Sequence, residues 1–259
     1  MLELITFTGA DDTVEPRHLC DVSDQHQHVE WGILVSLTSE GHSRFPSRSW
    51  IKKLLDHKTD STKLAMHISG GLLRELMIGS TVLLEEFGSM LQGFDRFQLN
   101  FHGEPTKCVP IKFVQAINKC IAPEQEVIFQ IDGNMGEALL TDCLTDHSNG
   151  VPLFDLSHGA GVLPDKWPAP RWVEPDLTPD MPPEATPNLK WKLHGYAGGI
   201  GTANVMDQVN RIEDVADGAP FWIDMETSLR TPDDRFSLAE CGEVIRKCRP
   251  FMGIGVDSE

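Results

Sequence analysis

Polar and charged side chains gather near the carboxyl ends of seven segments whose patterning predicts β-strands. Alternate residues of a strand face the same side of a sheet, so these side chains share one side. A purely structural interior would be aliphatic there, because buried polar groups without partners are costly. The pattern therefore predicts a mouth that faces a ligand. Its residues are Thr6, Thr8, His67, Ser69, Gln98, Asn100, His102, Gln130, Asp132, Asp155, Ser157, His194, Tyr196, Asp224 and Glu226.

A pair of adjacent glycines directly follows one of these segments. In the run AGGIGTAN, Gly198 and Gly199 stand between the expected strand 191–197 and an amphipathic helix. Glycines let backbone N–H groups approach an anion, and a helix amino terminus favours negative charge. Thr202 is placed to cap that helix. The run predicts a phosphate cradle, with a simple turn of the chain as the alternative.

Eight strand-like runs, most of them separated by helical patterns, must position these residues. Such alternation is typical of a parallel sheet with right-handed crossovers. Eight β/α units in about 250 residues match a TIM (β/α)8 barrel, whose active site lies on the loops after the strands. We expect one α/β barrel domain over 1–259, with an open doubly wound sheet as the competing layout. The expected strands are 2–8, 29–36, 63–69, 96–102, 126–132, 151–157, 191–197 and 220–226, and the expected helices include 47–57, 72–91, 135–147 and 237–248.

Residues 164–191 interrupt this alternation with many prolines and acidic residues. Proline breaks helices, so we expect a long surface loop inserted between the sixth and seventh strands. Loops of this length are often functional. The insertion is either a lid over the barrel mouth or a rigid, extended segment that covers the barrel.

Charge and composition argue against several classes of partner. The net charge of −17, without a strong basic patch, disfavours nucleic acids and anionic membrane surfaces. No apolar run approaches the roughly 20 residues that span a bilayer, and the amino-terminal residues do not resemble a signal peptide, so a cytoplasmic location is expected. Neither MHISGG nor IDGNMGEA completes a dinucleotide fingerprint, and no cofactor is expected. A small anionic ligand in a pocket fits all of these observations.

Over nearly all eight units the chain resembles the phosphoribosylanthranilate isomerase family of tryptophan biosynthesis. The resemblance lies in ITFTG, WGILVSLTSEGHSRFPS, FQLNFHGE, LFDLSHGAGVLPDKW, YAGGIGTANV and WIDMETSLRTPDDR. It implies an isomerase whose substrate is a small phosphorylated sugar. Arg44 matches the family's substrate-binding arginine, and His102 falls in the segment similar to its Gln-Leu-His-Gly motif. Thr227 and Ser228 fall where the family completes its phosphate site.

The family's reaction is an Amadori rearrangement of an N-linked ribose phosphate into an open-chain aminoketose. An acid opens the sugar ring and a base then removes the C2 proton. The resemblance implies that Asp155 is the acid and places Thr8 at the position of the catalytic cysteine. A threonine hydroxyl does not accept a proton near neutrality as a thiolate does. Another residue such as His67 or Asp11 then supplies the base, or the chemistry differs, or the barrel binds the ligand without catalysis.

Glu226 adjoins the expected phosphate site and would repel an anion unless Arg230 or Arg44 neutralises it.

A metal-dependent epimerase, aldolase or hydrolase is a second interpretation, because imidazole and carboxylate groups at strand ends suit Zn or Mn. No HxH or HExxH spacing supports it. Its ligands would be drawn from His67, His102, Asp132, Asp155 and His194.

Overall fold

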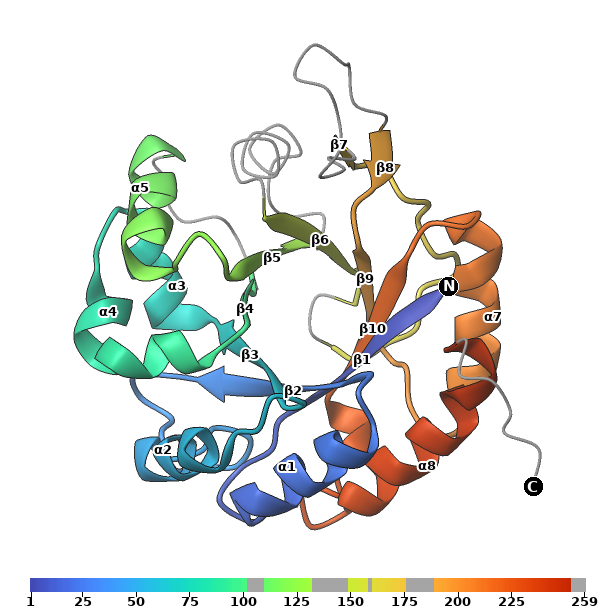
Figure 1. Cartoon of the computed structure of the whole chain (residues 1–259), viewed down its shortest axis with the longest axis horizontal. Coiled ribbons are helices and arrows are strands. Elements are labelled where there is room, and N and C mark those ends of the chain that lie inside the picture. Colours follow the sequence, from blue (N-terminus) through green and yellow to red (C-terminus); the bar gives the residue numbers. More distant parts are fainter. Residues whose placement is uncertain (102–109, 132–148, 158–159, 176–188, 253–259) are drawn as a thin grey trace.

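Eight parallel strands form a closed barrel in a computed structural model that describes residues 1–101, 110–131, 149–157, 160–175 and 189–252. The strands follow one another around the barrel in the order β1-β10-β9-β6-β5-β4-β3-β2, and helices form an outer layer around them (Figure 1). The expected single-domain TIM barrel is confirmed, and the open sheet is not the layout. The barrel strands are β1 (Leu2–Thr8), β2 (Val29–Val35), β3 (Lys63–Ile68), β4 (Arg96–Leu99), β5 (Glu126–Ile131), β6 (Gly150–Asp155), β9 (His194–Ala197) and β10 (Phe221–Met225).

The described helices alternate with the strands as expected, with one correction. The segment 72–91 is three elements rather than one helix, because Gly79 adopts a φ of +94° between the first two. The expected helix 135–147 lies outside the described residues. The helical elements are α1 (Pro16–Gln25), α2 (Arg48–His57), α3 (Gly70–Met77), α4 (Val82–Phe87), η1 (Gly88–Gly93), α5 (Pro110–Cys120), α7 (Val205–Ala216), η2 (Thr227–Leu229), α8 (Leu238–Cys248) and η3 (Arg249–Phe251). None of these described helices is both long and apolar enough to cross a bilayer.

The proline-rich insertion contains regular structure, contrary to the expectation of a plain loop. Strand β7 (Val173–Pro175) pairs antiparallel with β8 (Leu189–Trp191), and β8 leads into β9. Earlier in the insertion, the buried Trp167 donates a hydrogen bond from Nε1 to Gln208 Oε1 on α7 at 3.1 Å. The described part therefore covers the outside of the barrel, which favours a covering segment over a lid.

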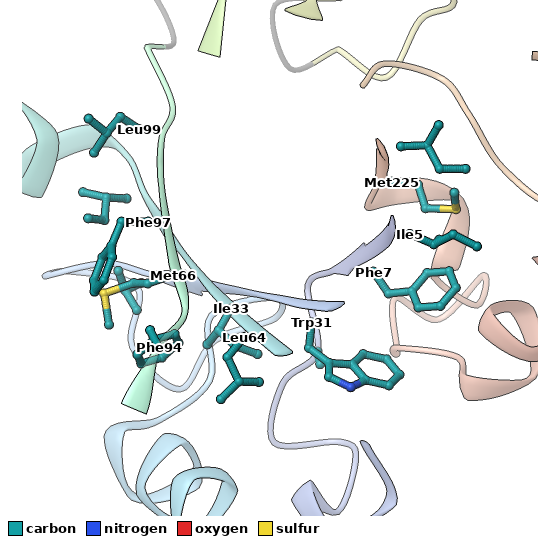
Figure 2. Packing of buried hydrophobic residues seen from close by; sticks show 14 of the residues in the cluster. Ile5, Phe7, Trp31, Ile33, Leu64, Met66, Phe94, Phe97, Leu99 and Met225 are labelled. Carbon is teal, nitrogen blue, oxygen red and sulfur yellow. The ribbon is translucent and has the colours of Figure 1, made fainter. Parts of the chain in front are cut away.

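The apolar core lies between the strands and the helices. Side chains that point outward from the strands pack beneath the helical layer, and Figure 2 shows Phe7 and Trp31 side by side, with ring centroids 5.7 Å apart. Burial of apolar area at roughly 25 cal/mol per Å² makes this layer the main source of stability. The outward side chains include Ile5, Phe7, Trp31, Ile33, Leu64, Met66, Phe97 and Leu99.

The barrel interior is only partly apolar. A small cluster that includes Leu153 and Trp222 fills its middle, and the Arg96 guanidinium lies 4.2 Å from the Trp222 ring centroid. Arg96 also pairs with the fully buried Glu30 at 3.1 Å, and Thr6 donates a hydrogen bond to Glu30 at 2.7 Å. These groups close the amino-terminal end of the barrel and leave its other end for the ligand-facing side chains.

Two Gly→Ala substitutions test this packing with opposite expected signs. A Cβ at Gly195 would lie 2.3 Å from the Trp222 ring and 2.5 Å from Leu153 Cδ1, whereas nothing lies within 4 Å of one at Gly242 in α8. We expect Gly195→Ala to destabilise the protein by about 1–3 kcal/mol through overpacking, and Gly242→Ala to stabilise it by about 0.5–1 kcal/mol. Urea unfolding measures both, and a neutral Gly195→Ala would contradict the described interior.

Candidate active site

The carboxyl ends of the barrel strands surround a cavity of about 270 Å³. A larger hollow of about 850 Å³ lies at the opposite end, near Glu30 and Arg96, but active sites of TIM barrels lie at the carboxyl ends of the strands. Six of the eight predicted site residues line the smaller cavity, whereas Arg44 does not and His102 lies outside the described residues. The six are Thr8, Asp155, Gly198, Gly199, Thr227 and Ser228.

Asp155 is the last residue of β6, and both of its carboxylate oxygens accept hydrogen bonds. Gln130 Nε2 donates to Oδ2 at 2.7 Å, and the Ser157 hydroxyl and backbone N–H donate to Oδ1 at 2.6 and 3.1 Å. Ser157 also receives a hydrogen bond from the Gly161 backbone N–H at 3.3 Å. These contacts fix the carboxylate on the wall of the cavity, where it can exchange a proton with a bound ligand.

Thr8 is paired with a second carboxylate, on β10. Its hydroxyl donates to Asp224 Oδ1 at 2.7 Å, and Gln98 Nε2 donates to Asp224 Oδ2 at 3.3 Å. Burial raises the pKa of Asp224 to about 7; Glu226 and Glu30 add to the rise, and the two hydrogen bonds oppose it. The strand pattern predicted Asp224 in the mouth but no role for it, because its contact with Thr8 joins residues 216 positions apart.

Gly32 on β2 makes room for this arrangement. A Cβ there would lie 2.1 Å from Thr8 Oγ1 and 2.8 Å from His67 Nε2, so both side chains lie against the glycine backbone. His67 Nδ1 is 3.2 Å from Gln98 Nε2, which links the imidazole to the Asp224 network. No polar residue of the second strand was predicted in the mouth. The structure explains this, because the side chains of Thr8 and His67 occupy the space beside Gly32.

Three amide oxygens on the cavity wall accept no hydrogen bond within the described part of the chain. They belong to Gln98, Asn100 and Gln130, each of which is almost completely buried. Buried polar atoms are nearly always satisfied in native proteins, by protein, water or ligand. The wall therefore presents acceptors that suit the hydroxyl or N–H groups of a bound molecule.

The loop after β9 requires its glycines. Gly198 and Gly199 have φ values of +111° and +67°, and a Cβ at Gly199 would lie 2.6 Å from the Leu163 nitrogen. Ser228, in the loop after β10, donates from its hydroxyl to the Ile200 carbonyl at 2.7 Å and joins the two loops. The backbone N–H groups of Gly199 and Ser228 find no acceptor in the portion that the structure describes.

The expectation that Thr202 caps the helix after this loop is wrong, and the residue at the N-cap position makes no side-chain capping hydrogen bond. Thr202 bonds to Glu240 on α8 instead, and Asn204 is the N-cap residue of α7. Its amide accepts from the Gly201 backbone N–H and donates to the Gly199 carbonyl, both at 2.9 Å. Asn204 therefore holds the glycine loop in shape.

Arg44 neutralises the carboxylate that adjoins the predicted phosphate site. Its guanidinium is 2.8 Å from Glu226 Oε1 and 3.3 Å from Thr227 Oγ1, and it also pairs with Asp234 at 3.4 Å. One of the two arginines anticipated from the sequence thus offsets Glu226. Arg44 contacts the rim of the site rather than its cavity, and its role in binding substrate stays a prediction.

Asp11 does not fit the alternative role of a base. Burial opposes its charge, but hydrogen bonds from Thr13, the Arg44 backbone and Arg230 prevail and lower its pKa. The Arg230 guanidinium contacts Asp11 at 2.8 Å and the Gly9 carbonyl at 2.7 Å. A carboxylate held in this way is a weak proton acceptor, and it lies outside the residues that line the cavity.

His194 and Tyr196 face away from the mouth, contrary to the expected parity of this strand. His194 Nδ1 lies 2.6 Å from the Lys192 carbonyl, its ring stacks on Phe154, and burial lowers its pKa to about 4. Gly195 and Ala197 point inward instead, because Trp222 occupies the interior beside them. The metal interpretation loses His194, and the described residues hold no group of three His, Cys, Asp or Glu suited to a metal. Asp132, another candidate ligand, lies outside the described residues.

Comparison with known proteins supports the fold but not a family. The sequence matches no family model and no curated protein. Two solved phosphoribosylanthranilate isomerases, one in complex with reduced 1-(o-carboxyphenylamino)-1-deoxyribulose 5-phosphate and one from Thermotoga maritima, are each 12% identical over 96% of this chain and 100% of theirs, with a TM-score of 0.53. Leishmania donovani UMP synthase is 9% identical over 97% of this chain and 54% of its own, with a TM-score of 0.54. At these identities the likeness shows a shared barrel fold alone.

The raised pKa of Asp224 predicts a specific pH dependence of stability. Between pH about 4 and about 7 the unfolded chain has lost this proton while the folded protein keeps it, so stability falls as pH rises. The loss reaches roughly 4 kcal/mol at most. We expect Asp224→Asn to flatten the curve of unfolding free energy between pH 4 and 8, and the exposed control Asp217→Asn to leave it unchanged. Equal slopes in wild type and Asp224→Asn would contradict the burial of this carboxylate.

Proposed function

We propose that this barrel binds a small phosphorylated sugar in the cavity at the carboxyl ends of its strands. We further propose that it isomerises an N-linked aldose phosphate to an aminoketose by an Amadori-type rearrangement. The observation that carries the proposal is the shared cavity, which brings the Asp155 carboxylate together with the loops of Gly198–Gly199 and Thr227–Ser228.

The anion end of the ligand is assigned to the loops after β9 and β10. TIM barrels frequently hold phosphate at the loops after their seventh and eighth strands, which here are β9 and β10. The backbone N–H groups of Gly199 and Ser228 are donors of the kind that bind phosphate oxygens. Arg44 offsets Glu226 at this rim, so the acidic side chain does not oppose the anion with a full charge.

The sugar end is assigned to the polar wall. Asp155 in its acid form would protonate the ring oxygen and open the sugar, and Gln130 and Ser157 hold its carboxyl group in place. The amide oxygens of Gln98 and Asn100 are acceptors for hydroxyl groups of the opened chain. Thr8, at the position of the family's cysteine, donates a hydrogen bond to Asp224 and acts on the reaction through that carboxylate.

The decisive assay uses phosphoribosylanthranilate with the wild type, Asp155→Asn and the remote control Asp217→Asn. We expect the wild type to form the aminoketose, and Asp155→Asn to lose about 10²–10⁴-fold in kcat, because a positioned acid contributes that much. Inorganic phosphate binding should persist in Asp155→Asn. Turnover that survives Asp155→Asn would remove Asp155 as the acid, and phosphate binding without turnover in the wild type would identify a non-catalytic binder.

Gly199→Ala tests the anion end against a matched control, Gly218→Ala. Both glycines have a positive φ, so each substitution carries a similar backbone cost of about 1–2 kcal/mol. Only the Cβ at position 199 meets backbone atoms, whereas nothing lies within 4 Å of one at position 218. Calorimetry with inorganic phosphate should show at least a tenfold (~1.4 kcal/mol) weaker affinity in Gly199→Ala alone. Equal affinities in the two variants would place the anion elsewhere.

A further inference from the structure

We propose that Asp224 is the base that removes the C2 proton from the ring-opened substrate, and that Thr8 is the positioning residue that orients it. This assignment rests on the proposed function and deepens it, because it names the proton acceptor that a threonine at position 8 cannot itself provide. The same cavity then holds an acid on β6 and a base on β10, two strands apart in the barrel order.

The geometry around Thr8 fixes the direction of its hydrogen bond. A hydroxyl has one proton to donate, and Thr8 Oγ1 lies 2.7 Å from Asp224 Oδ1, whose carboxylate form only accepts. Gln98 Nε2 donates to the other oxygen at 3.3 Å. Each carboxylate oxygen thus has one donor and retains acceptor capacity for a substrate proton. Gly32 secures the arrangement, because any larger residue there would strike Thr8.

The charges near Asp224 preserve its basicity. Glu226, which directly follows β10, and Glu30 on β2 both raise the pKa of Asp224 further, although each pairs with an arginine, Arg44 and Arg96 respectively. His67 on β3 reaches Asp224 through Gln98, and Asp155 on β6 shares the cavity. Within the described residues, no Lys, Arg or His forms an ion pair with Asp224.

Asp11 shows the opposite environment in the same molecule. Its carboxylate contacts the Arg230 guanidinium at 2.8 Å, and its pKa is lowered, whereas burial without a cation raises the pKa of Asp224 to about 7. A base with a pKa near the working pH combines the correct ionisation state with sufficient proton affinity. Of these two aspartates, Asp224 alone lines the cavity and suits the task.

The proton transfer balances without any further reactant. Once Asp155 has opened the ring, the substrate is an iminium with a double bond between C1 and nitrogen. An Asp224 oxygen takes the C2 proton, the C2–H electron pair forms the C1–C2 double bond, and the C1–N π pair moves to nitrogen. The protonated Asp224 then gives its proton to C1 of the enolamine, and the C2 hydroxyl proton passes to the Asp155 carboxylate, which gives the aminoketose and returns both residues to their starting states.

The test compares wild type, Asp224→Asn, Thr8→Val and Thr8→Ser with phosphoribosylanthranilate from pH 5 to 9. We expect Asp224→Asn to lose about 10²–10⁴-fold in kcat while its affinity for inorganic phosphate stays within twofold, which also shows that it is folded. The Thr8 hydrogen bond lowers the pKa of Asp224. Thr8→Val should therefore move the acid-side midpoint of the kcat/KM profile to higher pH, and Thr8→Ser should restore it.

Each other outcome is decisive. Asp224→Asn with more than a tenth of wild-type kcat would overturn the assignment of the base while the proposed function stands. An unmoved midpoint in Thr8→Val would overturn the positioning role of Thr8. A wild type that binds phosphate but converts no phosphoribosylanthranilate would overturn the proposed function, and this assignment with it.

Discussion

The site depends on a carboxylate that is buried inside the barrel without a cationic partner among the residues that the structure describes. Asp224 receives hydrogen bonds from Thr8 and Gln98, but these do not fully replace the water that it loses on folding. Such a group destabilises the folded state at neutral pH. The free energy of unfolding that is lost by burying this ionised carboxylate is a few kcal/mol, which is a large fraction of the stability of a typical domain. Strained or costly groups of this kind concentrate at functional sites.

The rest of the barrel treats its charges differently. At the amino-terminal end, Arg96 compensates Glu30, and at the rim Arg44 compensates Glu226. In both places a guanidinium pairs with the carboxylate, although burial still raises the pKa of Glu30 above its ordinary value. Glu226 and Glu30 still raise the pKa of Asp224 despite their arginine partners, whereas Asp224 itself forms no ion pair within the described residues. The contrast separates a carboxylate held only by neutral donors from carboxylates held by arginines within one fold.

The barrel itself could be predicted from sequence, because the periodicities of strands and helices are local. The count of eight β/α units then predicts a closed barrel. The glycine pair could also be predicted, since Gly198 and Gly199 must adopt a backbone conformation that other residues rarely do. The orientation of His194 could not. Its strand is short, and the parity depends on Trp222, a residue of another strand that fills the interior.

The role of Asp224 also lay beyond the sequence. Strand parity places Asp224 in the mouth, but no local feature predicts that its pKa is raised while that of Asp11, which pairs with Arg230, is lowered. The difference arises from tertiary neighbours, and from the glycine at position 32 that lets Thr8 lie where it does. Likewise, the sequence shows only that Thr8 lacks a proton acceptor that works near neutrality, whereas the structure shows that its hydroxyl donates a hydrogen bond to Asp224.

The most direct test of this account is a ¹³C NMR titration of the aspartate carboxyl groups in the unliganded wild type, with the Asp224 signal assigned from its absence in Asp224→Asn. A midpoint near pH 7 is expected for this signal, because burial raises the pKa of Asp224. A midpoint near 4, the ordinary value for an exposed aspartate, would contradict it.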